Sequence, residues 1–140
     1  VRAGSRVIDI GSGAGVPALS IALIAGPEGH VTATDPSPRF VSALMENAAA
    51  LGFTNFDAIQ TSAAQLPFPS ESSDAATCHF GVMFFPDMRA GLAQVRRVLK
   101  SGAKAGFICW GPPAQNTFFN VGSRVVASYL PPQPQRKRKR

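Results

Sequence analysis

The chain has 140 residues, of which 45% are hydrophobic and 16% charged, a size and composition that fit one globular domain and exclude a wholly disordered chain. The longest apolar run, residues 16–26, falls well short of the roughly 20 residues that span a membrane, so no membrane span is expected. The net charge of +6 comes mainly from the five basic residues that end the chain; residues 1–135 hold 9 basic and 8 acidic side chains, which argues against nucleic acid as a partner of the folded part.

Strand-like and helix-like segments alternate along the chain, separated by glycine and proline. The expected strands are residues 6–10, 30–34, 56–60, 74–80 and 105–110, and the expected helices are residues 16–25, 39–51, 87–99 and 116–129, with a turn or short helical piece at 61–65 and a turn at 101–102. One apolar stripe of the second helix is expected to face the core: Phe40, Val41, Leu44, Ala48 and Leu51. The alternation predicts a Rossmann-like α/β fold, a parallel sheet with helices on both faces, because parallel strands need helix-length crossovers.

The first expected strand ends in a glycine-rich loop, Asp9-Ile10-Gly11-Ser12-Gly13-Ala14-Gly15. Glycine lets the backbone turn sharply and lets a ligand approach closely, and ligands of such sheets bind at the carboxyl ends of the strands. Asp35 stands 20 residues after Gly15, at the end of the second expected strand, where a carboxylate can accept hydrogen bonds from ribose hydroxyls. The alternative interpretation is a tight turn in which Asp35 only caps the next helix.

The loop differs from a dinucleotide-binding loop in one position and one charge. The pattern G-x-G-x-x-G would need glycine where Val16 stands. Asp9 would repel a pyrophosphate, whereas a cationic ligand would be tolerated beside it. S-adenosylmethionine has a sulfonium and an ammonium group and no phosphate, so the loop favours this cofactor over NAD.

At this point the chain resembles a known family. Residues 7–15 resemble motif I of class I S-adenosylmethionine-dependent methyltransferases, and the resemblance extends over about residues 5–120. It is carried further by residues 31–35, 66–69, 74–85, 95–102 and 107–110. The small-molecule branch, with the ubiquinone- and menaquinone-biosynthesis methyltransferases, is similar. The resemblance implies a cytoplasmic enzyme that transfers a methyl group from S-adenosylmethionine to a small-molecule acceptor.

The resemblance also implies a set of cofactor-binding residues: Asp9, Gly11, Gly13, Gly15, Asp35, Pro36, Ser62, Ala63 and Phe80. Gly11 and Gly13 would line the methionine part of the cofactor, with Asp9 near its ammonium group. Gly15 would keep the turn close to the following helix. Asp35 would bind the ribose.

The adenine side departs from the family pattern. Pro36 would lie near the adenine, and the family then has an acid followed by alanine before its Leu-Pro-Phe segment. Here these two positions are Ser62 and Ala63. A serine hydroxyl still offers one hydrogen bond, so the missing carboxylate is expected to weaken cofactor binding by about 1 kcal/mol.

The segment after the fourth expected strand is the candidate reaction centre. Phe80 and Met83 are expected to form an apolar wall, since aromatic faces stabilise a sulfonium. His79 is the candidate general base, with a structural histidine at a strand end as the alternative. Trp110 is a candidate for the acceptor pocket, with core packing as its alternative. No metal site is expected.

Four further side chains have structural interpretations. Cys78 and Cys109 lie in apolar stretches without a C-x-x-C spacing and are expected to be buried free thiols. Phe84 and Phe85 are expected to pack in the core beneath a helix, with substrate contact as the alternative. Asp87 is expected to cap the third helix.

The extent of the chain also carries expectations. The resemblance implies a five-stranded sheet in the order 3-2-1-4-5 with an exposed edge at strand five. Residues 1–130 are interpreted as an S-adenosylmethionine-binding core, truncated at both ends, and residues 131–140 as a disordered basic tail. A nuclear-targeting or nucleic-acid-binding patch and attachment to an anionic membrane surface are the alternatives for the tail. Two alternatives stay open: a cofactor-binding remnant without turnover, and an NAD-dependent oxidoreductase. The oligomeric state is left open.

Overall fold

The computed structural model describes residues 1–130, so the predicted basic tail at residues 131–140 lies outside the described residues. The chain divides into two compact units, Val1–Cys109 and Trp110–Arg140. The boundary falls inside the predicted core of residues 1–130, whose extent stays a prediction. The second unit contains a short 3₁₀ helix, Pro113–Gln115, and helix α4, Thr117–Tyr129.

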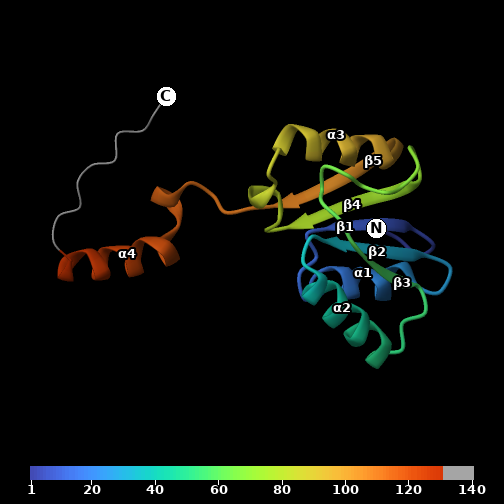
Figure 1. The fold of residues 1–140 in the computed structure, drawn as a ribbon, viewed down its shortest axis with the longest axis horizontal. Coiled ribbons are helices and arrows are strands. Elements are labelled where there is room, and N and C mark those ends of the chain that lie inside the picture. The colour runs from blue at the N-terminus through green and yellow to red at the C-terminus, as the bar shows by residue number, and fades with distance from the viewer. Residues whose placement is uncertain (131–140) are drawn as a thin grey trace. The chain divides into compact units, whose positions relative to one another are not determined.

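The first unit is built on a five-stranded parallel sheet in the order β3-β2-β1-β4-β5, which confirms the predicted order (Figure 1). The strands are β1 (Arg6–Ile10), β2 (His30–Asp35), β3 (Phe56–Gln60), β4 (Ser73–His79) and β5 (Leu99–Ile108). The central strand β1 is almost wholly buried, as expected for a strand with both faces covered.

Helices cover both faces of this sheet. Helices α1 (Ala18–Ala25) and α2 (Pro38–Ala50) lie on one face, and α3 (Met88–Val98) lies on the other (Figure 1). Each face has its own apolar cluster, with Leu44 of α2 at the centre of one and Val95 and Val98 of α3 in the other. Asp87 caps α3 as predicted, its Oδ1 accepting a hydrogen bond from the Ala90 amide at 2.9 Å.

The connection from β3 to β4, residues 61–72, contains no helix. Residues 63–65 form a turn and bend, and a second turn follows at residues 70–71, where Glu71 has φ of +54°. Ala63 and Leu66 are nevertheless buried in the same apolar cluster as Val95 and Val98 of α3. This helix-free connection and α3 therefore contribute to one core on the same face of the sheet.

Strand β5 begins at Leu99, six residues earlier than expected. Ser73 pairs with Leu99, but Ala75 pairs with Lys104, so extra residues bulge between the two registers. Gly102, with φ of +78°, lies in this irregular stretch. The predicted turn at residues 101–102 is therefore wrong: the glycine serves a bulge within the strand.

The exposed edge predicted at strand five is confirmed, since nearly every residue of β5 is exposed or half-buried. Cys78 on β4 is buried as expected, but Cys109, just past the end of β5, is exposed, so the prediction that both thiols are buried is wrong for Cys109. Burial raises the pKa of the Cys78 thiol to about 11. No helix within residues 1–130 is both long and apolar enough to cross a membrane.

Only part of the apolar stripe predicted for α2 is buried. Leu44 and Ala48 are buried, whereas Phe40 is 48% exposed and Leu51 is 64% exposed. Leu44 also lies against the glycine loop, because a Cβ at Gly15 would come within 2.6 Å of Leu44 Cδ1. The helix thus anchors the loop through one leucine.

We predict that Leu44→Ala destabilises the chain by about 2–5 kcal/mol, because it removes a buried side chain and leaves a cavity. Leu51→Ala, on the same helix but exposed, should change the free energy of unfolding by about 0.5 kcal/mol or less. Urea denaturation followed by circular dichroism measures both. Equal losses in the two variants would contradict the role assigned to Leu44.

Candidate functional site

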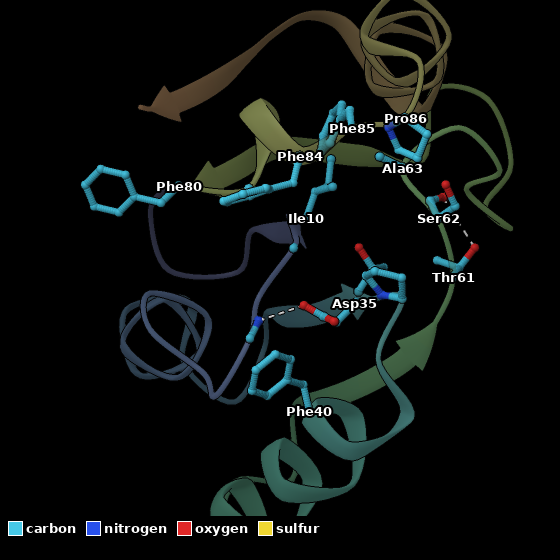
Figure 2. Close-up of a pocket in the computed structure, with 15 residues that line it drawn as sticks. Ile10, Asp35, Phe40, Thr61, Ser62, Ala63, Phe80, Phe84, Phe85 and Pro86 are labelled. Atoms are coloured by element: carbon cyan, nitrogen blue, oxygen red, sulfur yellow. Dashed lines mark hydrogen bonds between the residues drawn. The ribbon is translucent and has the colours of Figure 1, made fainter. Parts of the chain in front are cut away.

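A cavity of about 370 Å³ opens at the carboxyl end of the sheet (Figure 2). The loops that follow four strands meet there, those after β1, β2, β3 and β4. Seven of the sequence-predicted cofactor residues line it: Gly11, Gly13, Asp35, Pro36, Ser62, Ala63 and Phe80. Parallel strands end at the same edge, so residues far apart in sequence converge there.

The glycine loop is bound firmly to the neighbouring strand β2. The amides of Gly11 and Ser12 both donate to the Thr34 carbonyl, at 2.8 and 3.0 Å. The Ser12 hydroxyl donates to the Asp9 carbonyl at 3.0 Å and accepts from the Thr34 amide at 3.2 Å. Gly11 and Gly13 have φ values of +68° and +53°, which glycine adopts without strain.

Asp35 joins the loop to the start of α2. Its Oδ2 accepts from the Gly13 amide at 3.0 Å, a bond drawn in Figure 2, and its Oδ1 accepts from the Ser37 amide at 2.9 Å. The second bond lies just before α2, whose N-cap residue is Ser37 and which has no side-chain capping bond, so the alternative in which Asp35 only caps the helix is wrong. The buried carboxylate lines the cavity as well, and each oxygen keeps a further lone pair for a ligand.

Asp9 lies beneath the loop and does not line the cavity. It is fully buried; its Oδ1 accepts from the Thr77 hydroxyl at 2.5 Å, and its Oδ2 has no hydrogen-bond partner among residues 1–130. Burial raises the pKa of this carboxyl above its ordinary value, while the hydrogen bond from Thr77 and the nearby Ser12 hydroxyl oppose the shift. Its contact with a cofactor stays a prediction.

The end of β4 closes another side of the cavity. Phe80 has φ of +58°, an unusual value for a residue with a side chain, and its amide donates to the Ile108 carbonyl at 2.8 Å. Gly81 follows in a crowded position: a Cβ there would lie 2.9 Å from Cys78 Sγ and 3.1 Å from the Ile10 carbonyl oxygen. A Cβ at Gly11 would in turn lie 3.3 Å from Gly81 Cα, so the two loops touch through glycines.

The opposite wall is the turn after β3. The Thr61 amide donates to the Asp35 carbonyl at 3.1 Å, and the Gln65 amide donates to the Ser62 carbonyl at 3.0 Å. The Ser62 hydroxyl accepts from the Ala64 amide at 3.3 Å. This wall therefore begins beside Asp35, the residue of β2 whose carboxylate also accepts the hydrogen bond from Gly13.

Several lining residues were missed from the sequence. Phe40 of α2, Thr61 and Gly81 line the cavity, and so does Phe84, which is 77% exposed (Figure 2). The expectation that Phe84 packs in the core is therefore wrong. Its neighbour Phe85 is half-buried and packs against the core cluster, as predicted, and it lines the cavity as well. The sequence indicates that one aromatic ring of such a pair packs in the core. Which of the two rings does so depends on the 3₁₀ helix, Val82–Phe84.

Besides Asp9, four predicted site residues lie outside the cavity wall or its unit. Gly15 packs against α1 and α2, as expected of a residue that keeps the turn and helix close. His79 and Met83 are partly buried but do not line the cavity, and the His79 ring lies 4.5 Å from that of Phe80. Trp110 begins the second unit. The catalytic and acceptor roles of His79, Met83 and Trp110 stay predictions.

Fold and site together define a class. The family model described as "Methyltransferase domain" matches residues 7–102, and the chain belongs to this family. This confirms the resemblance inferred from the glycine loop and the motifs that follow it. Within residues 1–130, no group of three or more His, Cys, Asp or Glu side chains could hold a metal ion.

Two curated relatives are similar in sequence. A demethylmenaquinone methyltransferase of Listeria monocytogenes is 34% identical over 113 residues, which are 81% of this chain and 48% of that protein. A 2-phytyl-1,4-naphtoquinone methyltransferase of Synechococcus elongatus is 35% identical over 108 residues, 76% of this chain and 46% of that protein. The chain spans about half the length of these curated relatives.

Solved structures agree on the fold. A SAM dependent methyltransferase from Aquifex aeolicus superposes with a TM-score of 0.75 at 24% identity, over 91% of this chain and 72% of that one. An arsenic (III) S-adenosylmethionine methyltransferase from Chlamydomonas reinhardtii gives a TM-score of 0.71 at 28% identity, over 75% of this chain and 38% of that one.

We predict that Gly81→Ala disturbs the cavity more than it disturbs the fold. The added methyl group meets Cys78 Sγ and the Ile10 carbonyl, so the loops after β1 and β4 must move apart. Amide hydrogen exchange should quicken about tenfold or more in the glycine loop, the change that follows when its closed state loses about 1.4 kcal/mol. Gly106→Ala is the control, because a Cβ there meets nothing within 4 Å; unchanged exchange in the Gly81 variant would contradict this packing.

We predict that Asp9→Asn raises the melting temperature at neutral pH. Because burial favours the protonated form, Asp9 contributes stability that is fully present below its unfolded pKa of 3.8 and is lost as pH rises through its raised folded pKa. The difference in melting temperature between Asp9→Asn and the original chain should therefore shrink as pH falls from 8 towards 4. Thermal melts over that range test this, with the exposed carboxyl variant Glu46→Gln as control; a lower melting temperature for Asp9→Asn at pH 7 would contradict it.

Proposed function

We propose that this chain binds S-adenosylmethionine in the cavity at the carboxyl end of the sheet. The observation that carries the proposal is the Asp35 carboxylate, held on the cavity wall by the Gly13 amide with lone pairs to spare. A ribose diol is the ligand that such a carboxylate suits at this edge of a Rossmann-like sheet. The volume of about 370 Å³ falls within the roughly 300–1,000 Å³ of small-molecule sites.

The remaining walls suit the other parts of this cofactor. Phe80 and Phe84 offer aromatic faces that attract a sulfonium. Pro36, Phe40 and Ala63 offer apolar surface for the adenine. Val16 stands where a dinucleotide-binding loop would need its third glycine, which argues against NAD as the ligand.

We further propose that the protein transfers the cofactor's methyl group to a small-molecule acceptor, in the cytoplasm. When bound, the cofactor supplies an electrophilic methyl carbon; the acceptor's electron pair forms the new bond as the carbon–sulfur bond breaks, leaving S-adenosylhomocysteine. The chain's own part is to hold both reactants in line and exclude water. Its aromatic walls suit a flat, apolar acceptor, and the two curated relatives are named for naphthoquinone-type acceptors.

The acceptor's proton must leave as the bond forms. The cavity wall carries hydroxyl groups and the Asp35 carboxylate but no imidazole. His79, next in sequence to Phe80, is the proposed base, because imidazole exchanges protons near neutral pH. A chain that binds cofactor without turnover would favour the alternative of a binding remnant.

We predict that the chain binds S-adenosylhomocysteine with micromolar affinity in isothermal titration and gives no response to NAD. Gly13→Ala should weaken this binding about tenfold or more, since a side chain at φ of +53° costs about 1–2 kcal/mol and the methyl group intrudes on the cavity.

Gly4→Ala is the matched control for this measurement. Gly4 also has a positive φ, +76°, and a Cβ there also meets nothing within 4 Å, but it does not line the cavity. Equal affinity in the Gly13 variant, the Gly4 variant and the original chain would refute the loop assignment. Binding of NAD in place of S-adenosylhomocysteine would refute the cofactor.

A further inference from the structure

The helix-free connection between β3 and β4 needs hydrogen-bond donors from elsewhere. Residues 61–72 form no ladder of backbone bonds, and Pro67 and Pro69 contribute no amide hydrogens. Buried carbonyls in such a segment must still find donors, since leaving them unpaired is costly. The side chain that supplies them holds this segment in place.

That side chain is Arg97 on α3. Its two terminal nitrogens donate to the carbonyls of Leu66 and Phe68, at 2.8 and 2.7 Å. The same guanidinium is oriented by Gln94, whose Oε1 accepts from Nε at 3.1 Å and from a terminal nitrogen at 2.8 Å. The main-chain carbonyl of Arg97 also accepts from the Glu71 amide at 2.9 Å.

The guanidinium has no ion pair with a carboxylate among residues 1–130. Its donors are spent on neutral oxygens of the connection and of Gln94, although a carboxylate would attract them more strongly. Arg97 is half-buried, so water replaces these bonds poorly. Its contacts join the C-terminal part of α3 to both ends of the segment from Leu66 to Glu71.

The segment that Arg97 holds is continuous with the cavity wall. Leu66 directly follows the turn of residues 61–65, in which the Thr61 hydroxyl donates to the Gln65 carbonyl at 2.8 Å. Ser62 and Ala63 of this turn line the cavity, whereas Arg97 does not. Leu66 is also buried, so the end of the turn is fixed by packing and by the guanidinium together.

We propose that Arg97 is a positioning residue for the cofactor cavity, acting through Leu66 and Phe68 to hold the turn that carries Ser62 and Ala63. Its effect on ligand binding rests on the proposed function of the cavity; its effect on the turn does not. The planar fork of arginine presents a separate nitrogen to each carbonyl, whereas lysine carries all its donors on one atom and has no second nitrogen to meet Gln94. Arginine at this position is therefore not interchangeable with lysine.

The first test uses the chain without ligand. Arg97→Lys should quicken amide hydrogen exchange in residues 61–66 about tenfold, the change expected when one hydrogen bond from a charged donor is lost. Exchange in the glycine loop, residues 11–15, should stay as it is. The control is Arg96→Lys, the exposed neighbour on the same helix. Unchanged exchange in residues 61–66 overturns the proposal, and so does an equal increase in both segments.

The second test separates positioning from general stability. Arg97→Lys should raise the Kd for S-adenosylhomocysteine about fivefold or more at a temperature where all variants are folded, about 1 kcal/mol of binding free energy. Val98→Ala, a buried core change on the same helix, should lower the melting temperature at least as much and leave the Kd within about twofold.

The outcomes distinguish the two proposals. If the original chain fails to bind S-adenosylhomocysteine, the proposed function fails, while the exchange result still decides the role of Arg97 in holding the turn. If the original chain binds and Arg97→Lys binds equally well, the inference about Arg97 is overturned and the proposed function stands. An equal loss of affinity in Val98→Ala also overturns it, because stability alone would then explain the effect.

Discussion

The attachment of the glycine loop to β2 is the constraint on which the site depends. Gly11 and Ser12 share the Thr34 carbonyl as acceptor, and Gly13 donates to the Asp35 carboxylate. If the loop moved away from β2, these groups would lose their hydrogen-bond partners. An unpaired buried polar group costs about 1–3 kcal/mol. The cavity floor is therefore preformed, and Asp35 is held where a ligand can reach it. One carboxylate thus serves both the turn and the proposed ribose contact.

The two walls beside this floor are held in different ways. The wall after β4 is fixed by backbone contact, since Gly81 lies against the loop at Gly11 and a Cβ on Gly81 would crowd Cys78 Sγ and the Ile10 carbonyl oxygen. The wall after β3 is fixed by a side chain, because Arg97 bonds the connection that carries it. A substitution at Gly81 would force the two loops apart, whereas a substitution of Arg97 would change only how the wall after β3 is held. The adenine side of the proposed cofactor site is accordingly the side that substitution can change without rebuilding the sheet.

The strands were predictable because short β-rich runs such as residues 6–10 end at glycine or proline, and their order was predictable because the family resemblance implies it. The start of β5 was not, because a glycine with positive φ looks alike in a turn and in the bulge at Gly102. The need for Gly81 comes from a tertiary contact that no local pattern records. Phe84 and Phe85 were not separable either, since a 3₁₀ turn decides which ring meets the core.

Asp9 links stability to the proposed chemistry. Its carboxyl is buried with one oxygen lacking a partner among the described residues, so ionisation there opposes folding. A cation bound in the cavity would offset part of that cost through its Coulomb attraction to the ionised carboxylate. A positively charged cofactor above the loop would favour the ionised form, and by linkage the ionised form would favour the cofactor. Binding should then strengthen as pH rises through the folded pKa of Asp9, the same interval in which the free chain loses the stability that the protonated carboxyl contributes. A buried acid that weakens the empty chain is thus consistent with a site built for a cationic ligand.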